Sequence, residues 1–148
     1  MDEIATFMAL SVLLTGLKNL ETPNPLETTM GKDYLRRLKE KFGADFTALL
    51  ALFASVSAAN PPDPLAALLA SAEFKGKTES MAKQVVNVWM LSMYRVEVLD
   101  VDPKKAKTGD DAPAEDAGFF EKGAIWPAIN AHPIGFSHSS SGYWVVKP

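Results

Sequence analysis

Over roughly the first hundred residues, apolar side chains recur every three or four positions, which is the spacing of one face of an α-helix. Prolines, glycines and capping residues divide this pattern into segments of helix length. The chain is therefore predicted to be mainly α-helical, a single compact domain of about five helices with an irregular aromatic C-terminal arm. The predicted helices cover residues 3–20, 32–42, 45–57, 64–72 and about 78–98.

The first predicted helix has almost no polar side. Ile4–Leu17 is strongly apolar but shorter than the ~20 residues that cross a bilayer. Asp2 and Glu3 precede it, where a signal peptide would carry positive charge, and acidic residues suit the first turn of a helix. We therefore expect a buried helix of a soluble domain. If the protein is exported, we expect its signal to have been removed or to belong to a partner.

Two later helices have clear apolar faces. The face of the second consists of Tyr34, Leu35, Leu38 and Phe42. Lysines and arginines occupy its other sides, and such residues more commonly form a solvated surface than a docking patch. The last helix carries Val85, Val88, Trp89, Met93 and Val96. We expect it to be central, with Trp89 in the core, because large aromatic side chains dominate cores.

After this helix the composition changes. Residues 102–116 are charged, rich in proline, glycine and alanine, and contain no aromatic or large aliphatic residue. Such a segment buries too little apolar surface to offset its ordering entropy, so we expect an exposed insertion. Its acidic side chains lack the alternating spacing and turn glycine of a calcium loop, which favours plain solvation. These side chains are Asp110, Asp111, Glu115 and Asp116.

Composition narrows the candidate functions. The 148 residues are 47% hydrophobic and carry a net charge of −3, which disfavours nucleic-acid binding because that needs a basic surface. The absence of cysteine excludes thiol nucleophiles and thiolate metal sites. His132 and His138 have no further His or Cys to complete a metal site. A small hydrolase using His138 and Ser139 is a minor alternative, because no third group is evident that would orient the base.

Three sequence blocks resemble one protein family. FMALSVLLTGLKNL (Phe7–Leu20) resembles its opening helix, F-x-x-L-S-x-x-L-T-G, and VVNVWMLSMY (Val85–Tyr94) resembles its tryptophan-bearing helix. SGYWVVKP (Ser141–Pro148) resembles its terminal G-aromatic-W-x-x-x-P, and AIWPAINAHPIG is similar to the sorbitol-type branch. The family comprises the small subunits of bacterial membrane-bound FAD-dependent sorbitol dehydrogenases and is related to the small subunits of glucose, fructose and gluconate dehydrogenases. Where the family often has tyrosine and then glycine, this chain has Met90 and Ser92.

The resemblance implies a non-catalytic small subunit without a cofactor of its own. Its partner would be a large flavoprotein subunit of the glucose–methanol–choline oxidoreductase type, which carries FAD and oxidises a sugar or polyol. The small subunit would assist the folding, stability and export of that partner. A multihaem cytochrome c subunit is a further partner in many members, and the complex would be periplasmic and membrane-associated through its partners. The alternative is a free-standing helical binding or scaffolding module.

Residues 131–148 are predicted to form a docking arm and not a catalytic site. Chain ends fray unless they are docked, and aromatic anchors dominate many interfaces, so Trp144 is the principal candidate contact. The other candidates are Trp126, His132, Pro133, Gly142, Tyr143 and Pro148. Trp126 suits a core position equally well. The alternative for the whole arm is that it folds back onto the helices of its own chain.

Overall fold

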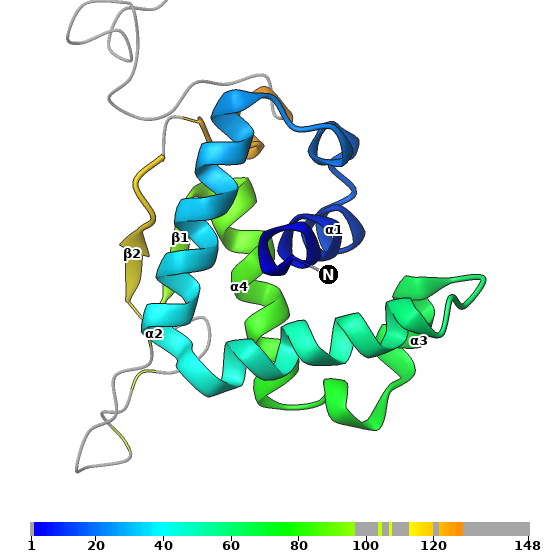
Figure 1. Ribbon diagram of the computed structural model, residues 1–148. Helices are drawn as coiled ribbons and strands as arrows, with labels where there is room; N and C mark the ends of the chain where they lie inside the picture. The colour runs from blue at the N-terminus through cyan, green and yellow to red at the C-terminus, as the bar shows by residue number, and fades with distance from the viewer. Residues whose placement is uncertain (1, 97–103, 105–106, 108–112, 120–121, 129–148) are drawn as a thin grey trace, which may run out of the picture.

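The computed structural model describes residues 2–96, 104, 107, 113–119 and 122–128. Four helices build most of the body, namely α1 (Glu3–Thr15), α2 (Pro25–Ala58), α3 (Pro64–Ala70) and α4 (Lys77–Leu91). The shorter elements are the 3-10 helices η1 (Lys18–Glu21) and η2 (Ala72–Phe74), strands β1 (Met93–Arg95) and β2 (Ala114–Asp116), and α5 (Ile125–Ala128). The prediction of a mainly α-helical, compact body is confirmed (Figure 1).

Helix α1 is shorter than the sequence suggested. It ends at Thr15, because Gly16 adopts the left-handed conformation (φ 71°) and its N–H donates to the carbonyl of Val12 at 2.8 Å. Glycine adopts this conformation without the steric cost that a Cβ would bring, and this is a common way to end a helix. The predicted end at residue 20 is therefore wrong, and η1 occupies the last residues of that range.

Helix α2 begins seven residues before the predicted start at Lys32. The Asn24 side chain accepts from the Glu27 N–H at 2.9 Å, and the Glu27 carboxylate accepts from the Asn24 N–H at 2.8 Å. This capping box, with Pro25 at the first helical position, starts the helix where a turn was expected.

The helices predicted over 32–42 and 45–57 are two arms of α2. They meet at Gly43, whose φ of 49° and ψ of −115° are non-helical, and Figure 1 shows the bend there. The sequence predicted that a helix begins at Asp45, but Asp45 lies within α2. Its carboxylate instead binds the Nζ of Lys77 at 3.1 Å.

The core lies where α4 packs against α1 and α2, which confirms the expected central position of α4. The predicted apolar face of α2 is confirmed as well, because Tyr34, Leu35 and Leu38 are buried and Phe42 is partly buried. The buried side chains of α4 include Val85, Val88 and Trp89. The predicted helix to residue 98 ends instead at Leu91, and Met93 and Val96 are half-buried beyond it.

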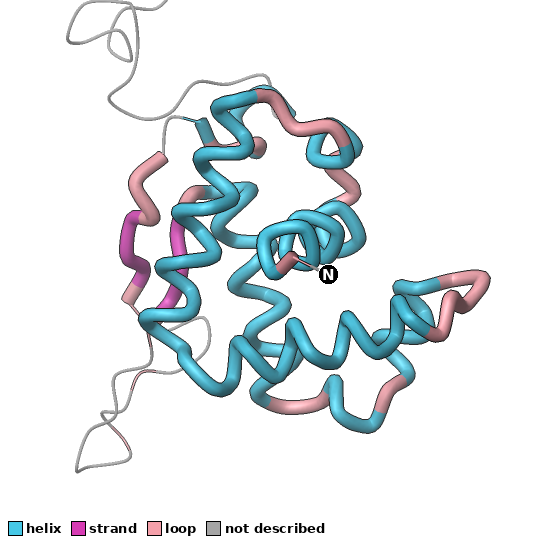
Figure 2. The backbone as a smooth tube through the Cα atoms, in the orientation of Figure 1, coloured by secondary structure: helices cyan, strands magenta, loops and turns pink. Residues whose placement is uncertain are grey.

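Part of the predicted exposed insertion is ordered in a strand. Ala114–Asp116 pairs antiparallel with Met93–Arg95, with Tyr94 opposite Glu115, and Figure 2 shows this two-stranded ribbon beside α2. Backbone pairing and charge hold this strand, as the Lys41 Nζ lies 2.9 Å from the Glu115 carboxylate. Because this strand buries little apolar surface, the apolar pattern of the sequence did not predict it. Most of the remaining insertion lies outside the described residues.

Within the described part of the chain, α2 is the one helix that is long and apolar enough, by length and composition, to cross a membrane. The bend at Gly43 divides that length. The arm at residues 25–42 carries eight charged side chains, and the arm at residues 44–58 is shorter than the ~17–25 residues of a membrane-spanning helix.

Candidate binding surfaces

The predicted docking arm, residues 131–148, lies outside the described residues. Its candidate contacts His132, Pro133, Gly142, Tyr143, Trp144 and Pro148 lie there too, as do His138 and Ser139 of the hydrolase alternative. Trp126 is described. It lies on α5, partly exposed, and its N–H donates to the carbonyl of Gly123 at 3.3 Å.

Many of the charged side chains of the described residues form ion pairs at the protein surface. Among them, no group of three or more histidine, cysteine, aspartate or glutamate side chains could hold a metal ion. The acidic and basic side chains form ion pairs with each other, mostly on α2 and the strands. The candidate functional features of this part of the chain are therefore its apolar grooves.

One apolar groove lies between α1 and the start of α2, and we call it the α1–α2 groove. Its volume is about 550 Å³. Its lining consists of Ile4, Ala5, Met8, Ala9, Val12, Leu20, Glu21, Pro23 and Thr28. Fully buried side chains of α1, by contrast, are limited to Thr6, Phe7, Leu10 and Ser11. The expected burial of this helix is therefore correct for one side only. Because α1 has no polar side, the sequence already indicated that a second apolar surface of this helix would need to be covered.

A second groove, which we call the α3–α4 groove, has a volume of about 330 Å³. It is lined by Leu14, Leu69, Phe74, Glu79, Ala82, Lys83, Val86 and Asn87. Leu69 is 53% exposed, and Leu65, one turn earlier on the same side of α3, is 36% exposed. The sequence predicted a short helix here, and the four-residue spacing of these leucines is a further signal within it. That spacing places them together, away from the buried Leu68.

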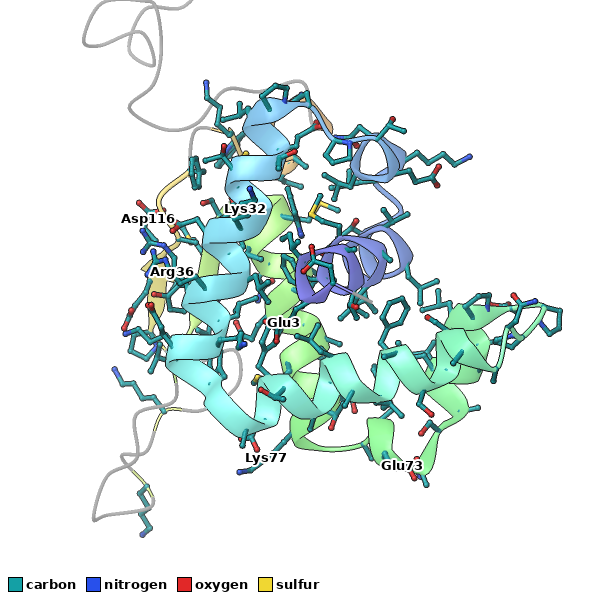
Figure 3. The ribbon with its side chains drawn as sticks, in the orientation of Figure 1. Glu3, Lys32, Arg36, Glu73, Lys77 and Asp116 are labelled. Atoms are coloured by element: carbon teal, nitrogen blue, oxygen red, sulfur yellow. The ribbon has the colours of Figure 1, made fainter. Side chains whose placement is uncertain are left out.

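The basic residues of α2 are paired within the helix, in line with the expected solvated surface. Asp33 binds Arg36 at 2.5 Å and Arg37 at 2.7 Å, and Arg36 also binds Glu40 at 2.8 Å. Figure 3 shows Arg36 on the outer side of this helix. Burial opposes ionisation of Asp33, but hydrogen bonds from Arg37 and Arg36 outweigh it and lower the pKa of Asp33.

A second charge cluster fastens the strands to α2. The Glu115 carboxylate binds the Lys41 ammonium and accepts a hydrogen bond from the Tyr94 hydroxyl at 3.1 Å. The bond from Lys41 lowers the pKa of Glu115. Burial, together with the hydrogen bond to Glu115, raises the pKa of Tyr94. An ionised Glu115 therefore holds β2 at this position.

Ser92 joins α2, α4 and the segment after β2. It is fully buried in a left-handed conformation (φ 52°), and its Oγ accepts from the Tyr34 hydroxyl at 3.0 Å and from the Phe119 N–H at 2.8 Å. Its carbonyl accepts from the Ala117 N–H at 2.6 Å. This position ends α4 and fixes the chain that returns from β2.

The returning segment closes the C-terminal end of α4. The Ala124 N–H donates to the carbonyl of Trp89 at 3.0 Å. A Cβ on Gly123 would lie 2.5 Å from the Met90 carbonyl oxygen, so only glycine permits this approach. The described chain thus leaves the body at α5, next to Trp89.

Trp89 occupies the contact between three helices. It is 3% exposed and packs edge-to-face with Tyr34 at a centroid distance of 5.1 Å, so its predicted core position is confirmed. A Cβ on Gly31 would lie 3.7 Å from the Trp89 ring and 2.6 Å from the Met8 sulfur. Within the described residues, the buried indole N–H of Trp89 has no hydrogen-bond acceptor.

Comparison of the chain with protein-family models, with curated protein sequences and with solved structures finds no match.

Proposed function

We propose that this chain is the non-catalytic small subunit of a bacterial FAD-dependent sugar or polyol dehydrogenase. It binds the large flavoprotein subunit and supports that subunit's folding, stability and export. The FAD belongs to the partner, and a multihaem cytochrome c subunit is a further member of such a complex in the periplasm. The observation that carries the proposal is the exposed apolar surface at the α3–α4 groove.

This surface has the features of a protein contact. α3 is a helix of seven residues that turns Leu68 into the body and leaves Leu65 and Leu69 largely exposed beside an apolar groove. Contiguous apolar patches on small proteins commonly mark contacts with other proteins. A large partner that covered the two leucines would remove their side chains from water at about 25 cal/mol per Å² of apolar surface.

The sequence resemblance supports the same surface. The opening block forms α1 and η1, and the tryptophan-bearing block forms the end of α4 and the start of β1. Leu14 from the first block and Val86 and Asn87 from the second line the α3–α4 groove together. Ser92 adopts a backbone conformation that suits glycine, which is the residue the family often has there.

Purification of the tagged chain from its native host tests the proposal. We expect a large subunit to copurify in a fixed ratio, to contain flavin, and to reduce an electron-accepting dye when a sugar or polyol is added. A chain that purifies alone, or with a protein that lacks flavin, contradicts the proposal. The second of these results supports the free-standing scaffolding module.

The variant Leu69→Gln tests the role of the groove. It places a polar group in the proposed contact, so we expect the flavoprotein to bind about tenfold or more weakly, which corresponds to about 1.4 kcal/mol. Ala66→Gln lies exposed on the same short helix and is the matched control, expected to bind as wild type does. Equal binding by both variants would remove the α3–α4 groove from the interface.

A further inference from the structure

We propose that residues 129–136 of this chain, INAHPIGF, form a strap that covers the α1–α2 groove. The groove is the open side of a helix that has no polar face, and it exposes Ala5 and Ala9 with Ile4, Met8 and Val12 half-buried around them. A helix that is apolar on all sides is normally covered on all sides.

The described chain ends close to this groove. The Ala124 N–H donates to the Trp89 carbonyl, and a Cβ on Gly31 would lie within 4 Å of both the Trp89 ring and the Met8 side chain. Met8 is part of the groove lining. Trp89, whose carbonyl binds the residue before α5, and Met8, which lines the groove, therefore both lie next to Gly31.

The strap is long enough to run from the end of α5 to the α1–α2 groove. Eight extended residues span about 26–29 Å, at about 3.3–3.6 Å for each residue. Packed helices lie only about 8–10 Å apart. Residues 129–136 can thus pass the start of α2 and run along the exposed alanines of α1.

The strap also suits the groove chemically. It supplies Ile129, Ile134 and Phe136, and no acidic residue occurs anywhere in residues 129–148. The polar edge of the groove includes Glu21, which favours a segment without negative charge. The α3–α4 groove fits this segment less well, because the Glu79–Lys83 ion pair, at 3.1 Å, forms part of its wall.

The strap would shorten the part of the docking arm that is free to contact the flavoprotein of the proposed function. Residues 129–136 would pack against their own chain, and contact with the flavoprotein would fall to residues 137–148, which contain Trp144. The strap itself does not require the flavoprotein. It is tested on the isolated chain, so its failure and the failure of the proposed function are separate results.

Disulfide trapping provides the first test. Because the chain has no native cysteine, only the introduced cysteines can form a disulfide. Ala131→Cys is combined in the full chain with Ala5→Cys or with Ala9→Cys. A disulfide needs Cα atoms about 4.4–6.8 Å apart, so it reports direct contact. The matched control pairs Ala131→Cys with the exposed Ala54→Cys on the second arm of α2. A further pair, with Asn87→Cys, samples the α3–α4 groove.

We expect mild oxidation to link residue 131 to residue 5 or 9, as seen on a non-reducing gel and in the mass of the linked peptide. The two other pairs should stay unlinked. Equal linking to residue 54, preferential linking to residue 87, or no linking to either groove position overturns the strap.

Thermal unfolding of the full chain provides the second test. Ile134→Gln combined with Phe136→Gln should lower Tm by about 4 °C or more, because polar side chains would replace two apolar contacts in the groove. Val145→Gln combined with Val146→Gln makes the same chemical change outside the strap and should leave Tm unchanged. An equal Tm for the two double variants overturns the strap.

Discussion

At the scale of single residues, Ser92 combines a strained backbone with two buried hydrogen bonds. A left-handed conformation costs about 1 kcal/mol for a residue that has a Cβ. The Ser92 hydroxyl offsets this cost by accepting from the Tyr34 hydroxyl and the Phe119 N–H, both inside the body. Serine therefore does what glycine could not do at this position, because it ties the returning segment to α2.

Ser92→Ala should lower the free energy of unfolding by about 1–3 kcal/mol, because it removes a buried acceptor and keeps the backbone strain. Ser92→Gly removes the same acceptor but relieves the strain, so it should be about 1 kcal/mol more stable than Ser92→Ala. Urea denaturation of both variants measures the difference, with the exposed Ser55→Ala as control. If Ser92→Ala is as stable as wild type, the hydroxyl does not hold this contact.

Asp33 makes stability depend on pH. Hydrogen bonds from Arg37 and Arg36 lower its pKa below 3.8 in the folded protein despite its partial burial. Because the folded pKa lies below the unfolded one, the stabilisation is complete above about pH 5 and is lost as pH falls through 4 and below. The Asp33 side chain is 24% exposed, so the loss should be about 1 kcal/mol or less.

Asp33→Asn should abolish this part of the acid sensitivity. Its free energy of unfolding should change less than that of wild type between about pH 5 and pH 3. Urea denaturation across this range measures both slopes. If the free energies of unfolding of the two proteins change with pH in parallel, the Arg36–Asp33–Arg37 cluster does not contribute to the acid sensitivity.

At the scale of elements, the bend in α2 determines how the body is organised. Gly43 turns the chain within a continuous run of helix, so that Phe46 at the start of the second arm can pack edge-to-face with Phe7 of α1 at 6.1 Å. The first arm carries most of the ion pairs of α2 and faces the strands, and the second carries apolar side chains such as Leu49 and Phe53 into the core.

Gly43→Ala should destabilise the protein by about 1–3 kcal/mol. The cost comes from the backbone, since open space surrounds a Cβ at this position and φ 49° with ψ −115° lies outside the regions open to alanine. Gly16→Ala is the matched control, also in open space but in the milder left-handed conformation, and should cost about 1 kcal/mol. An equal or smaller cost for Gly43→Ala would mean that the bend relaxes without strain.

The sequence predicted helices better than it predicted their ends. The 3.6-residue period of Tyr34, Leu35 and Leu38 correctly predicted the buried face of α2. Gly43 was predicted to end a helix, whereas it bends α2, because a glycine that ends a helix and one that bends a helix have the same sequence pattern. The strand at 114–116 was missed because its partner lies about twenty residues earlier and its contacts are polar.

At the scale of the whole molecule, the two grooves lie on surfaces that no element of the described chain covers. Their positions could not be predicted from the sequence, because a groove depends on how α1, α3 and α4 are placed relative to one another. The sequence did contain a partial signal, in the all-apolar α1 and in the leucine pair of α3. The docking arm itself stays a prediction, since residues 131–148 lie outside the described residues.

Trp144→Ala should weaken assembly with the proposed flavoprotein partner by about 2–4 kcal/mol, or roughly 30- to 1,000-fold in affinity, as expected when an aromatic anchor is truncated. His138→Ala and Ser140→Ala should do much less. Binding is measured by pull-down of the flavoprotein, with circular dichroism on the same samples.

Two outcomes would contradict this division of roles. If Trp144→Ala unfolds the chain, the tryptophan belongs to the core and not to an arm. If His138→Ala removes the activity of the complex while assembly stays normal, the arm reaches the active site of the partner.

The burial of Trp89 also affects how this protein should fluoresce. An excited indole emits at longer wavelength when water or polar groups reorient around it, and Trp89 is 3% exposed with no acceptor among the described residues. Its emission should therefore lie at the blue edge and resist quenching by iodide, unlike that of the partly exposed Trp126. A red shift of this component during unfolding would report the separation of α1, α2 and α4, without any added label.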